Sequence, residues 1–180
     1  RKSYEGAELR IDVVDQNNDH VYQPGLLFVP FGLAHADEIT RPRNRQLHRG
    51  INYHQSGISS VDIEANEVLL GDGMVLPYDV LLIATGSVLQ PEETEGMGGP
   101  GWLETVFTFY DMEGATALAA KLENFVAGRL VINIVDMPIQ WRVAPHALAF
   151  LAAWLLTEPG VRDARAVRQL TPLDRALTTP

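Results

Sequence analysis

The feature that most constrains the fold is the run Val75–Ser87, an apolar stretch that stops at Ala84-Thr85-Gly86. An unbroken apolar stretch of this kind is typical of strands covered on both faces in parallel sheets. In such sheets, ligands bind beyond the carboxyl ends of the strands. Threonine offers a hydroxyl there, and glycine lets a ligand come close to the backbone. The run predicts a buried parallel strand that ends at a cofactor, with an ordinary core strand and turn as the alternative.

The composition indicates a globular chain and excludes several classes of function. Of its 180 residues 46% are hydrophobic, and 23 acidic residues against 14 basic ones give a net charge of -9. This charge gives no electrostatic basis for binding nucleic acid, and it disfavours binding to anionic lipid. Cysteine is absent, which excludes disulfides and thiol nucleophiles from this chain. The five histidines have no paired metal-ligand spacing, so no metal is expected.

Neither a signal peptide nor a membrane span is predicted. The first residues are polar and lack an initiating methionine, which predicts an excised piece of a longer protein. The longest uncharged apolar segment, Val143–Leu156, is too short to cross a bilayer.

A carboxylate is predicted at the end of an early strand. Leu9–Val14 has the β-branched residues of a strand, and Asp15 follows it before the turn-forming residues 16–19. In dinucleotide-binding folds, a carboxylate at the end of the second strand accepts hydrogen bonds from the ribose hydroxyls. An ordinary surface turn opened by Asp15 is the alternative. The glycine-rich turn that would cradle a pyrophosphate is missing before it.

The segment Tyr22–Leu33 is apolar and punctuated by proline and glycine, so we expect neither a regular strand nor a helix there. Either a flat aromatic cofactor or another part of the protein must cover it. The basic cluster Arg41–Arg45 that follows is either a solvated loop or a contact for a phosphate or a partner domain.

A small antiparallel meander is predicted next. Ile51–Ile63 and Glu67–Leu70 alternate as strands do, and Gly71-Asp72-Gly73 is a hairpin turn. Asp111 then opens a helix that Gly128 would cap at its carboxyl end.

A second mononucleotide-binding unit is predicted from a buried strand over Arg129–Val135 and a helix over His146–Leu156. The loop between them has no glycine, and its prolines remove backbone amides, which argues against NADH at this turn. We therefore predict an α/β fold with two dinucleotide-binding, Rossmann-like units of the FAD/NAD(P)-binding kind. Both are incomplete, the first within residues 1–108 and the second within residues 109–180.

Seven segments carry a recognisable family pattern: residues 15–20, 22–33, 76–87, 91–93, 136–139, 143–145 and 171–176. Together they resemble the sulfide:quinone oxidoreductases, flavoproteins of the disulfide reductase superfamily with two dinucleotide-binding domains. The resemblance covers nearly the whole chain. It implies bound FAD, electron transfer from sulfide to a quinone, and a cytoplasmic protein or one attached peripherally to a membrane through parts outside this chain.

The resemblance also implies FAD-binding roles for six residues, each by its position in the family pattern. Asp15 would bind the adenosine ribose, the backbone of Ile58 would lie at the adenine, and Pro24 would lie close to the flavin. Ala84, Thr85 and Gly86 would border the pyrophosphate and ribityl region.

The chain departs from the family at the position of its redox cysteine. In the family pattern a cysteine follows Met-Pro-Ile-Lys, whereas Trp141 stands there in this chain. A thiolate attacks or carries sulfur and an indole does not, so no catalytic residue is assigned here. A second cysteine, found in some members in the region of residues 91–102, is absent too.

Two other functions stay open. A type II NADH:quinone dehydrogenase would require a glycine-rich turn after Val135, which the chain lacks. A non-catalytic flavin-fold module is favoured by the absent thiols. Because the first glycine-rich turn is missing, we expect the chain by itself to bind FAD weakly or not at all.

Overall fold

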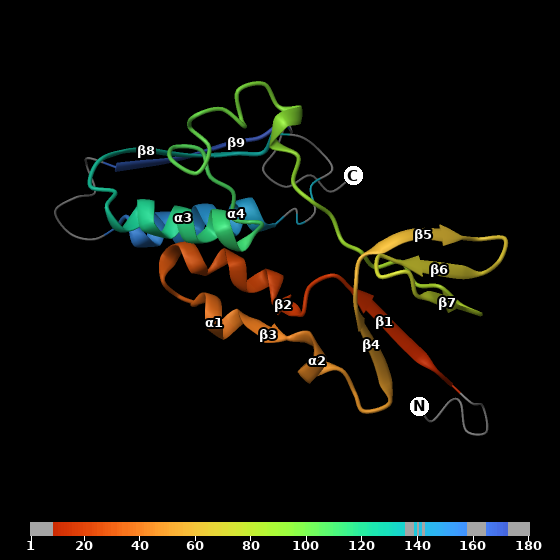
Figure 1. The fold of residues 1–180 in the computed structure, drawn as a ribbon. Helices are drawn as coiled ribbons and strands as arrows, with labels where there is room; N and C mark the ends of the chain where they lie inside the picture. The colour runs from red at the N-terminus through yellow and green to blue at the C-terminus, as the bar shows by residue number, and fades with distance from the viewer. Residues whose placement is uncertain (1–8, 136–138, 140, 142, 158–164, 173–180) are drawn as a thin grey trace. The chain divides into compact units, whose positions relative to one another are not determined.

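The structure is a computed structural model that describes residues 9–135, 139, 141, 143–157 and 165–172 (Figure 1). These residues form two compact units. The first combines the chain up to Val21 with Thr40–Val88, and the second combines Tyr22–Ile39 with the chain from Leu89 onward. Both units contain helices and strands, which confirms the predicted mixed α/β class. The division after residue 108, drawn along the sequence alone, stays a prediction.

A pair of parallel strands organises the first unit. Strand β1 (Ile11–Asp15) pairs with β4 (Ile51–Gln55), with Ile11 opposite Ile51 and Asp15 opposite Gln55. The predicted strand that ends at Asp15 is therefore confirmed. The chain between these strands forms an antiparallel pair and a short helix in this unit: β2 (Asp19–Val21), β3 (Thr40–Pro42) and α2 (Arg43–Gln46).

One face of the β1 and β4 pair carries a cluster of polar side chains around Asp12. Arg10 Nε donates a hydrogen bond to Asp12 Oδ2 at 2.7 Å, and Asn52 donates to Oδ1 at 3.1 Å. His54 Nε2 lies 2.8 Å from the same Oδ1. These bonds, the one from Arg10 above all, lower the pKa of Asp12 from its ordinary 3.8 to about 2. The ionised carboxylate thus ties the two strands together.

The Asp12 cluster makes the first unit sensitive to acid. Because the folded pKa lies below the unfolded one, the stabilisation is fully present above pH 3.8 and is lost as the pH falls through about 2. Urea denaturation followed by circular dichroism between these pH values should show stability falling with pH, and falling less in Asp12→Asn. Asp19→Asn, at an exposed position in β2, is the control and should keep the wild-type slope. Equal slopes in all three proteins would contradict this role of Asp12.

The predicted meander is confirmed as a three-stranded antiparallel sheet in the order β5, β6, β7. Its strands span Ile58–Asp62, Glu67–Leu70 and Val75–Pro77. The hairpin turn is closed by the N–H of Leu70, which donates to the carbonyl of Met74. Gly73 in this turn has a φ of 89°, a conformation that suits glycine. The single strand expected over residues 51–63 is instead two strands, because β4 pairs with β1 and β5 with β6.

The predicted buried parallel strand ending at Ala84-Thr85-Gly86 is wrong for this structure. Strand β7 is antiparallel and stops at Pro77, and Leu81–Gln90 has no regular secondary structure. Three apolar side chains of the expected strand are largely exposed: Val80 (88%), Leu82 (85%) and Ile83 (69%). A strand with two apolar faces needs a neighbouring strand and cover on both sides. Among the described residues, no strand pairs with the part of the run that follows Pro77.

The second unit begins with two short 3₁₀ helices, η2 (Gln23–Leu27) and η3 (Val29–Phe31). The segment was expected to have no regular structure, and short 3₁₀ turns accommodate its prolines at their first positions. The helix α1 (Ala36–Ile39) follows. A Cβ on Gly25 would lie 2.6 Å from Ile39 Cγ2, so glycine allows the close packing of η2 on α1. Other parts of the unit cover the segment, since Leu27 and Phe31 belong to its core.

The core of the second unit is formed by helices packed on a parallel strand pair. Helix α3 (Met112–Glu123) follows the short η4 (Pro91–Glu93), and β8 (Gly128–Asn133) pairs with β9 (Arg165–Leu170). Helix α4 (Ala144–Leu155) joins these strands and confirms the predicted second helix. The buried residues of this core are Leu27, Phe31, Phe109, Leu118, Leu122, Ile132, Ala144, Leu148 and Ala152.

Three expectations for this unit need correction or addition. Gly128 does not cap α3, because Asn124 is the C-cap of that helix. Gly128 is instead the first residue of β8 and has a φ of 123°. Strand β8 is buried on one face only, with Ile132 inside and Val131 exposed, because only part of the sheet is covered by helices. Strand β9 was missed, since residues 165–170 alternate charged and apolar side chains only weakly.

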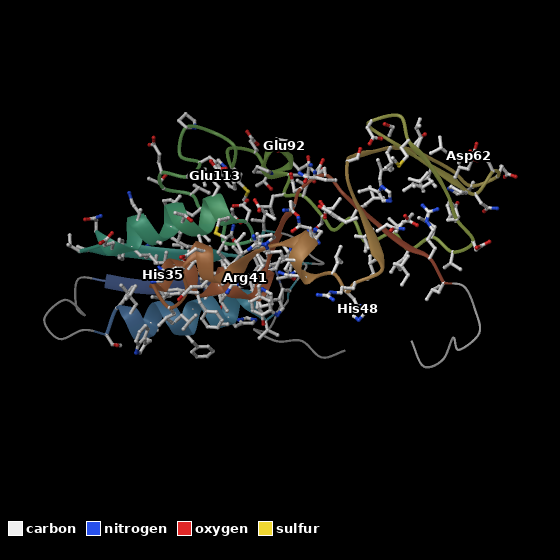
Figure 2. The ribbon with its side chains drawn as sticks, turned by 60° about the horizontal axis from the view of Figure 1, so that its bottom comes forward. His35, Arg41, His48, Asp62, Glu92 and Glu113 are labelled. Atoms are coloured by element: carbon white, nitrogen blue, oxygen red, sulfur yellow. The ribbon has the colours of Figure 1, made fainter. Side chains whose placement is uncertain are left out.

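Charged side chains lie at the surface of both units, and among the described residues none is buried (Figure 2). No helix in the described part of the chain has the length and apolar character needed to cross a bilayer.

The start of α3 depends on a side-chain cap, as the sequence predicted. Asp111 Oδ1 accepts a hydrogen bond from the N–H of Gly114 at 2.7 Å. Asp111→Ala should lower the free energy of unfolding by about 1 kcal/mol, because this N–H loses its acceptor. Urea denaturation followed by tryptophan fluorescence measures the change, since all three tryptophans lie in this unit. Asp111→Asn keeps a capping oxygen and should retain most of the stability, and an equal loss in both variants would rule out capping as the cause.

Candidate functional site

The carboxylate of Asp15 lies at the carboxyl end of β1 in the first unit. Its Oδ1 accepts the N–H of Asn17 at 2.9 Å, and its Oδ2 forms an ion pair with a terminal nitrogen of Arg43 at 2.9 Å. Both side chains are partly exposed, Asp15 to 29% and Arg43 to 27%. Each carboxylate oxygen has two acceptor positions, so each keeps one for a ligand hydroxyl.

Hydrogen bonds from backbone and side-chain groups hold the turn after β1 against its neighbours. The carbonyl of Asn18 accepts the N–H of Arg43 at 2.5 Å, and its side-chain oxygen accepts the N–H of Asn44 at 3.1 Å. On the other side, the hydroxyl of Tyr53 in β4 donates to the carbonyl of Asn17 at 2.8 Å. The turn is thus fixed between α2 and β4, and this orients the carboxylate of Asp15, which directly precedes the turn.

The other predicted FAD-binding residues of the first unit are exposed. Ile58 is the first residue of β5, at a register irregularity between Ile58 and Ser60, where the backbone departs from regular pairing. Ala84-Thr85-Gly86 lies in the irregular segment after β7. Gly86 has a φ of 76°, and a Cβ there would meet no atom within 4 Å. Its backbone is therefore open to close approach, and the FAD-binding roles of these residues stay predictions.

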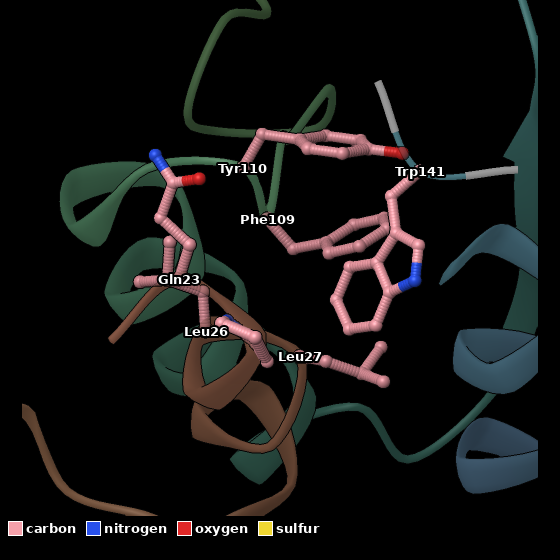
Figure 3. A pocket seen from close by; sticks show the side chains of 7 residues that line it. Gln23, Leu26, Leu27, Phe109, Tyr110 and Trp141 are labelled. Atoms are coloured by element: carbon pink, nitrogen blue, oxygen red, sulfur yellow. The ribbon is translucent and has the colours of Figure 1, made fainter. Parts of the chain in front are cut away.

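The second unit contains a cavity of about 280 Å³ that is mainly apolar (Figure 3). This volume is at the low end for a small-molecule site. The rings of Phe109 and Tyr110 are stacked, with centroids 4.6 Å apart and planes inclined by 27°. Figure 3 shows the indole of Trp141 beside these rings and Leu27 below them. The lining residues are Gln23, Pro24, Leu26, Leu27, Phe109, Tyr110 and Trp141.

Three separate segments build this cavity. Pro24 and the buried Leu26 come from η2, Tyr110 directly precedes the cap of α3, and Trp141 precedes α4. Sequence reasoning identified Pro24 and Trp141 but missed the pair Phe109-Tyr110. The signal for this pair was its place directly before the capping residue of α3, where the helix start fixes the backbone.

The hydroxyl oxygen of Tyr110 is buried and has no hydrogen-bond partner among the described residues. Burial also raises the pKa of Tyr110 above its ordinary 10.0, so the hydroxyl stays protonated and available as a donor at neutral pH. An apolar cavity with three aromatic side chains and one unpaired hydroxyl suits a flat ring system that carries a polar atom.

The unpaired hydroxyl predicts a gain in stability when it is removed. Tyr110→Phe should leave the free energy of unfolding unchanged or raise it by up to about 1 kcal/mol, because a buried hydroxyl without a partner carries a desolvation cost. Urea denaturation followed by tryptophan fluorescence is the measurement. Tyr22→Phe, at a residue 58% exposed, is the control and should have no effect. A clear loss of stability in Tyr110→Phe alone would mean that the hydroxyl is bonded in the native state.

Comparison with known proteins supports the resemblance to the sulfide:quinone oxidoreductases. The mitochondrial sulfide:quinone oxidoreductase of Dictyostelium discoideum is 22% identical over 154 residues, which are 85% of this chain and 34% of that protein. The structure of the sulfide:quinone oxidoreductase from Aquifex aeolicus matches 89% of this chain and 37% of its own, with 21% identity and a TM-score of 0.72. No family model matches the chain.

A further solved structure, NDH2 from Plasmodium falciparum, matches 88% of this chain and 36% of its own, with 14% identity and a TM-score of 0.60. At these identities the solved structures establish the fold alone. The chain has the fold of the FAD/NAD(P)-binding oxidoreductases, as predicted, and it spans about a third of the length of the sulfide:quinone oxidoreductase relative.

Proposed function

We propose that the protein is an FAD-dependent, quinone-linked oxidoreductase that resembles sulfide:quinone oxidoreductase, and that Asp15 binds the adenosine ribose of its FAD. The observation that carries the proposal is the partly exposed Asp15 carboxylate at the end of the parallel pair β1 and β4. In dinucleotide-binding folds this place and this side chain serve the ribose. The similarity to sulfide:quinone oxidoreductases over 85% of the chain supports FAD as the dinucleotide.

Described residues of the first unit fit two parts of FAD. The free acceptor positions of Asp15 suit the two hydroxyls of a ribose. The open backbone at Gly86 suits close approach of a pyrophosphate. The cavity of the second unit, taken by itself, suits a flat ring that carries a polar atom. When bound, FAD accepts two electrons from a donor and delivers them to an acceptor such as a quinone.

The electron donor is the point at which this chain departs from its relatives. Trp141 lines the cavity at the position where the family pattern has a redox cysteine. An indole has no thiol with which to bond sulfide sulfur, so this position cannot relay sulfur. The bulk of the indole also excludes water. We therefore propose a weak or absent response to sulfide. The glycine-free turn that argues against NADH includes residues 136–138, 140 and 142, which lie outside the described residues.

A quinone acceptor dissolves in lipid, so peripheral attachment to a membrane is part of the proposal. The charge of -9 disfavours anionic lipid as a partner for this chain, and the contact is therefore assigned to parts of the protein outside it.

Absorbance of the full-length protein, purified with its native cofactor, tests the proposal. We expect the spectrum of an oxidised flavin that sulfide bleaches slowly or not at all in the absence of oxygen. A related protein that keeps the family cysteine, treated with the same concentrations of sulfide, is the positive control. Rapid sulfide-dependent reduction of a quinone by a protein confirmed to carry Trp141 would contradict the argument from the missing thiol.

The other outcomes distinguish the remaining functions. Rapid bleaching by NADH would identify an NADH:quinone dehydrogenase and overturn the argument from the glycine-free turn. A protein without flavin would overturn the proposal altogether and favour the non-catalytic flavin-fold module.

A further inference from the structure

We propose that three exposed arginines of the first unit, Arg41, Arg45 and Arg49, form a docking surface for an acidic protein. We refer to these three residues as the arginine surface. The inference goes beyond the proposed function, because it concerns a protein partner and requires neither FAD nor a quinone.

Charge is segregated along the chain around the arginine surface. Four of the 14 lysines and arginines lie within residues 41–49, whereas all 23 acidic residues lie outside residues 39–61. No lysine or arginine occurs from residue 50 to residue 120. The arginine surface is therefore a positive stretch on a chain whose net charge is -9. An acidic partner is attracted to this stretch and repelled by acidic surface elsewhere, which orients its approach.

Two of the three arginines lack a partner within the described part of the chain. Arg45 and Arg49 are exposed, and neither forms an ion pair or a side-chain hydrogen bond with another described residue. Arg41 is exposed as well, and one of its terminal nitrogens donates to the carbonyl of Thr40 at 3.0 Å. Arg43 differs, because it is partly buried and already has an ion pair. Arg45 and Arg49 thus present positive charge that no described carboxylate neutralises.

The backbone that carries the arginine surface is fixed by hydrogen bonds. Strand β3, which contains Arg41, pairs with β2. The N–H groups of Arg43 and Asn44 donate to the carbonyl and the side chain of Asn18, and the N–H of Leu47 donates to the carbonyl of Arg43. The arginine surface is therefore preorganised, and binding to it costs less conformational entropy than ordering a mobile loop.

These hydrogen bonds also argue against a small phosphate as the ligand. Phosphates are commonly bound by successive backbone N–H groups that point at the ligand. In this segment the N–H groups of Arg43, Asn44, Leu47 and Ile51 already have acceptors within the first unit. The three arginines come from β3, from α2 and from the turn before β4, rather than from one loop. Guanidinium groups from separate elements suit several carboxylates on the surface of a partner.

The dimensions of the arginine surface suit a compact partner. Residues 41–49 span at most about 30 Å when fully extended. This is about the width of a standard protein contact, which buries about 800 Å² on each partner. A DNA duplex or a membrane surface extends further and approaches exposed acids of the same unit in and beside the β5–β7 sheet: Asp62, Glu64, Glu67 and Asp72. Their repulsion favours an acidic protein over nucleic acid or anionic lipid.

Fluorescence anisotropy with a labelled peptide of glutamates tests the arginine surface, with the full-length protein as the titrant. A peptide of about ten glutamates is about 33 Å long when extended and covers the surface. It should bind at low salt, and raising the salt concentration from about 0.02 M to about 0.2 M should weaken binding severalfold, because salt screens exposed charges. A glutamine peptide of the same length is the control and should not bind.

Paired variants make the result specific. Arg45→Gln combined with Arg49→Gln should weaken binding of the glutamate peptide about tenfold, the equivalent of two surface ion pairs. Arg45→Lys combined with Arg49→Lys keeps the charge and should retain most of the binding. Arg129→Gln combined with Arg168→Gln removes the same charge from exposed positions of the second unit and should leave binding unchanged. Circular dichroism confirms that each variant is folded.

Further probes distinguish other ligands. Displacement of the glutamate peptide by inorganic pyrophosphate at micromolar concentration would identify a phosphate site and overturn the proposal. A DNA duplex of about 20 base pairs is about 68 Å long and tests nucleic acid, and vesicles of phosphatidylglycerol with phosphatidylcholine test anionic lipid. If either binds more tightly than the glutamate peptide and loses binding in Arg45→Gln combined with Arg49→Gln, the partner is not an acidic protein.

Two results would overturn the docking surface itself. One is the absence of peptide binding to the full-length protein at low salt. The other is equal binding of the peptide by the wild type and by Arg45→Gln combined with Arg49→Gln. Neither result changes the flavin spectrum of the full-length protein, so the proposed function is tested separately.

Discussion

The parallel pairing of β1 with β4 is the constraint on which the candidate nucleotide site depends. Pairing in register brings Asp12 of one strand beside Asn52 and His54 of the other, and the Asp12 carboxylate links the strands across one face. The same register ends β1 at Asp15, next to the turn that Asn18 and Tyr53 hold in place. A two-stranded parallel pair has few backbone hydrogen bonds of its own, so these side-chain bonds matter more here than in a wide sheet.

The second unit shows how core packing and a cavity arise from the same segments. Leu27 of η2 packs into the helical core and also lines the cavity. Phe109 does the same from the segment before α3, where the Asp111 cap fixes the start of the helix. The cavity is therefore bounded by residues whose positions the core already determines. Trp141 completes the lining with an aromatic ring, which keeps the cavity mainly apolar.

Sequence reasoning succeeded where short-range signals decide the structure. The strand ending at Asp15, the hairpin at Gly73 and the helix beginning at Asp111 are each determined by neighbouring residues, and each was predicted. It failed for Val75–Ser87, whose apolar character requires strand neighbours from elsewhere in the chain, and the described residues pair only its first residues, in β7. At the candidate site, Asp15 and Pro24 were identified from the sequence. Arg43 was singled out only as part of the basic cluster Arg41–Arg45, and Tyr110 was not identified, because the Asp15–Arg43 ion pair is a long-range contact and the Tyr110 hydroxyl is buried only in the folded chain.

The sequence by itself determined the α/β class, the places of Asp15 and the meander, and the absence of any thiol from this chain. These follow from local propensity, from turn residues and from composition, which need no knowledge of distant contacts. Only the tertiary structure decided that Asp15 is paired with Arg43, that Tyr110 and Trp141 line one cavity, and that the segment ending at Ala84-Thr85-Gly86 is exposed. The physical reason is that pairing, burial and exposure depend on which distant residues meet, and an apolar run is buried only where other parts of the chain cover it.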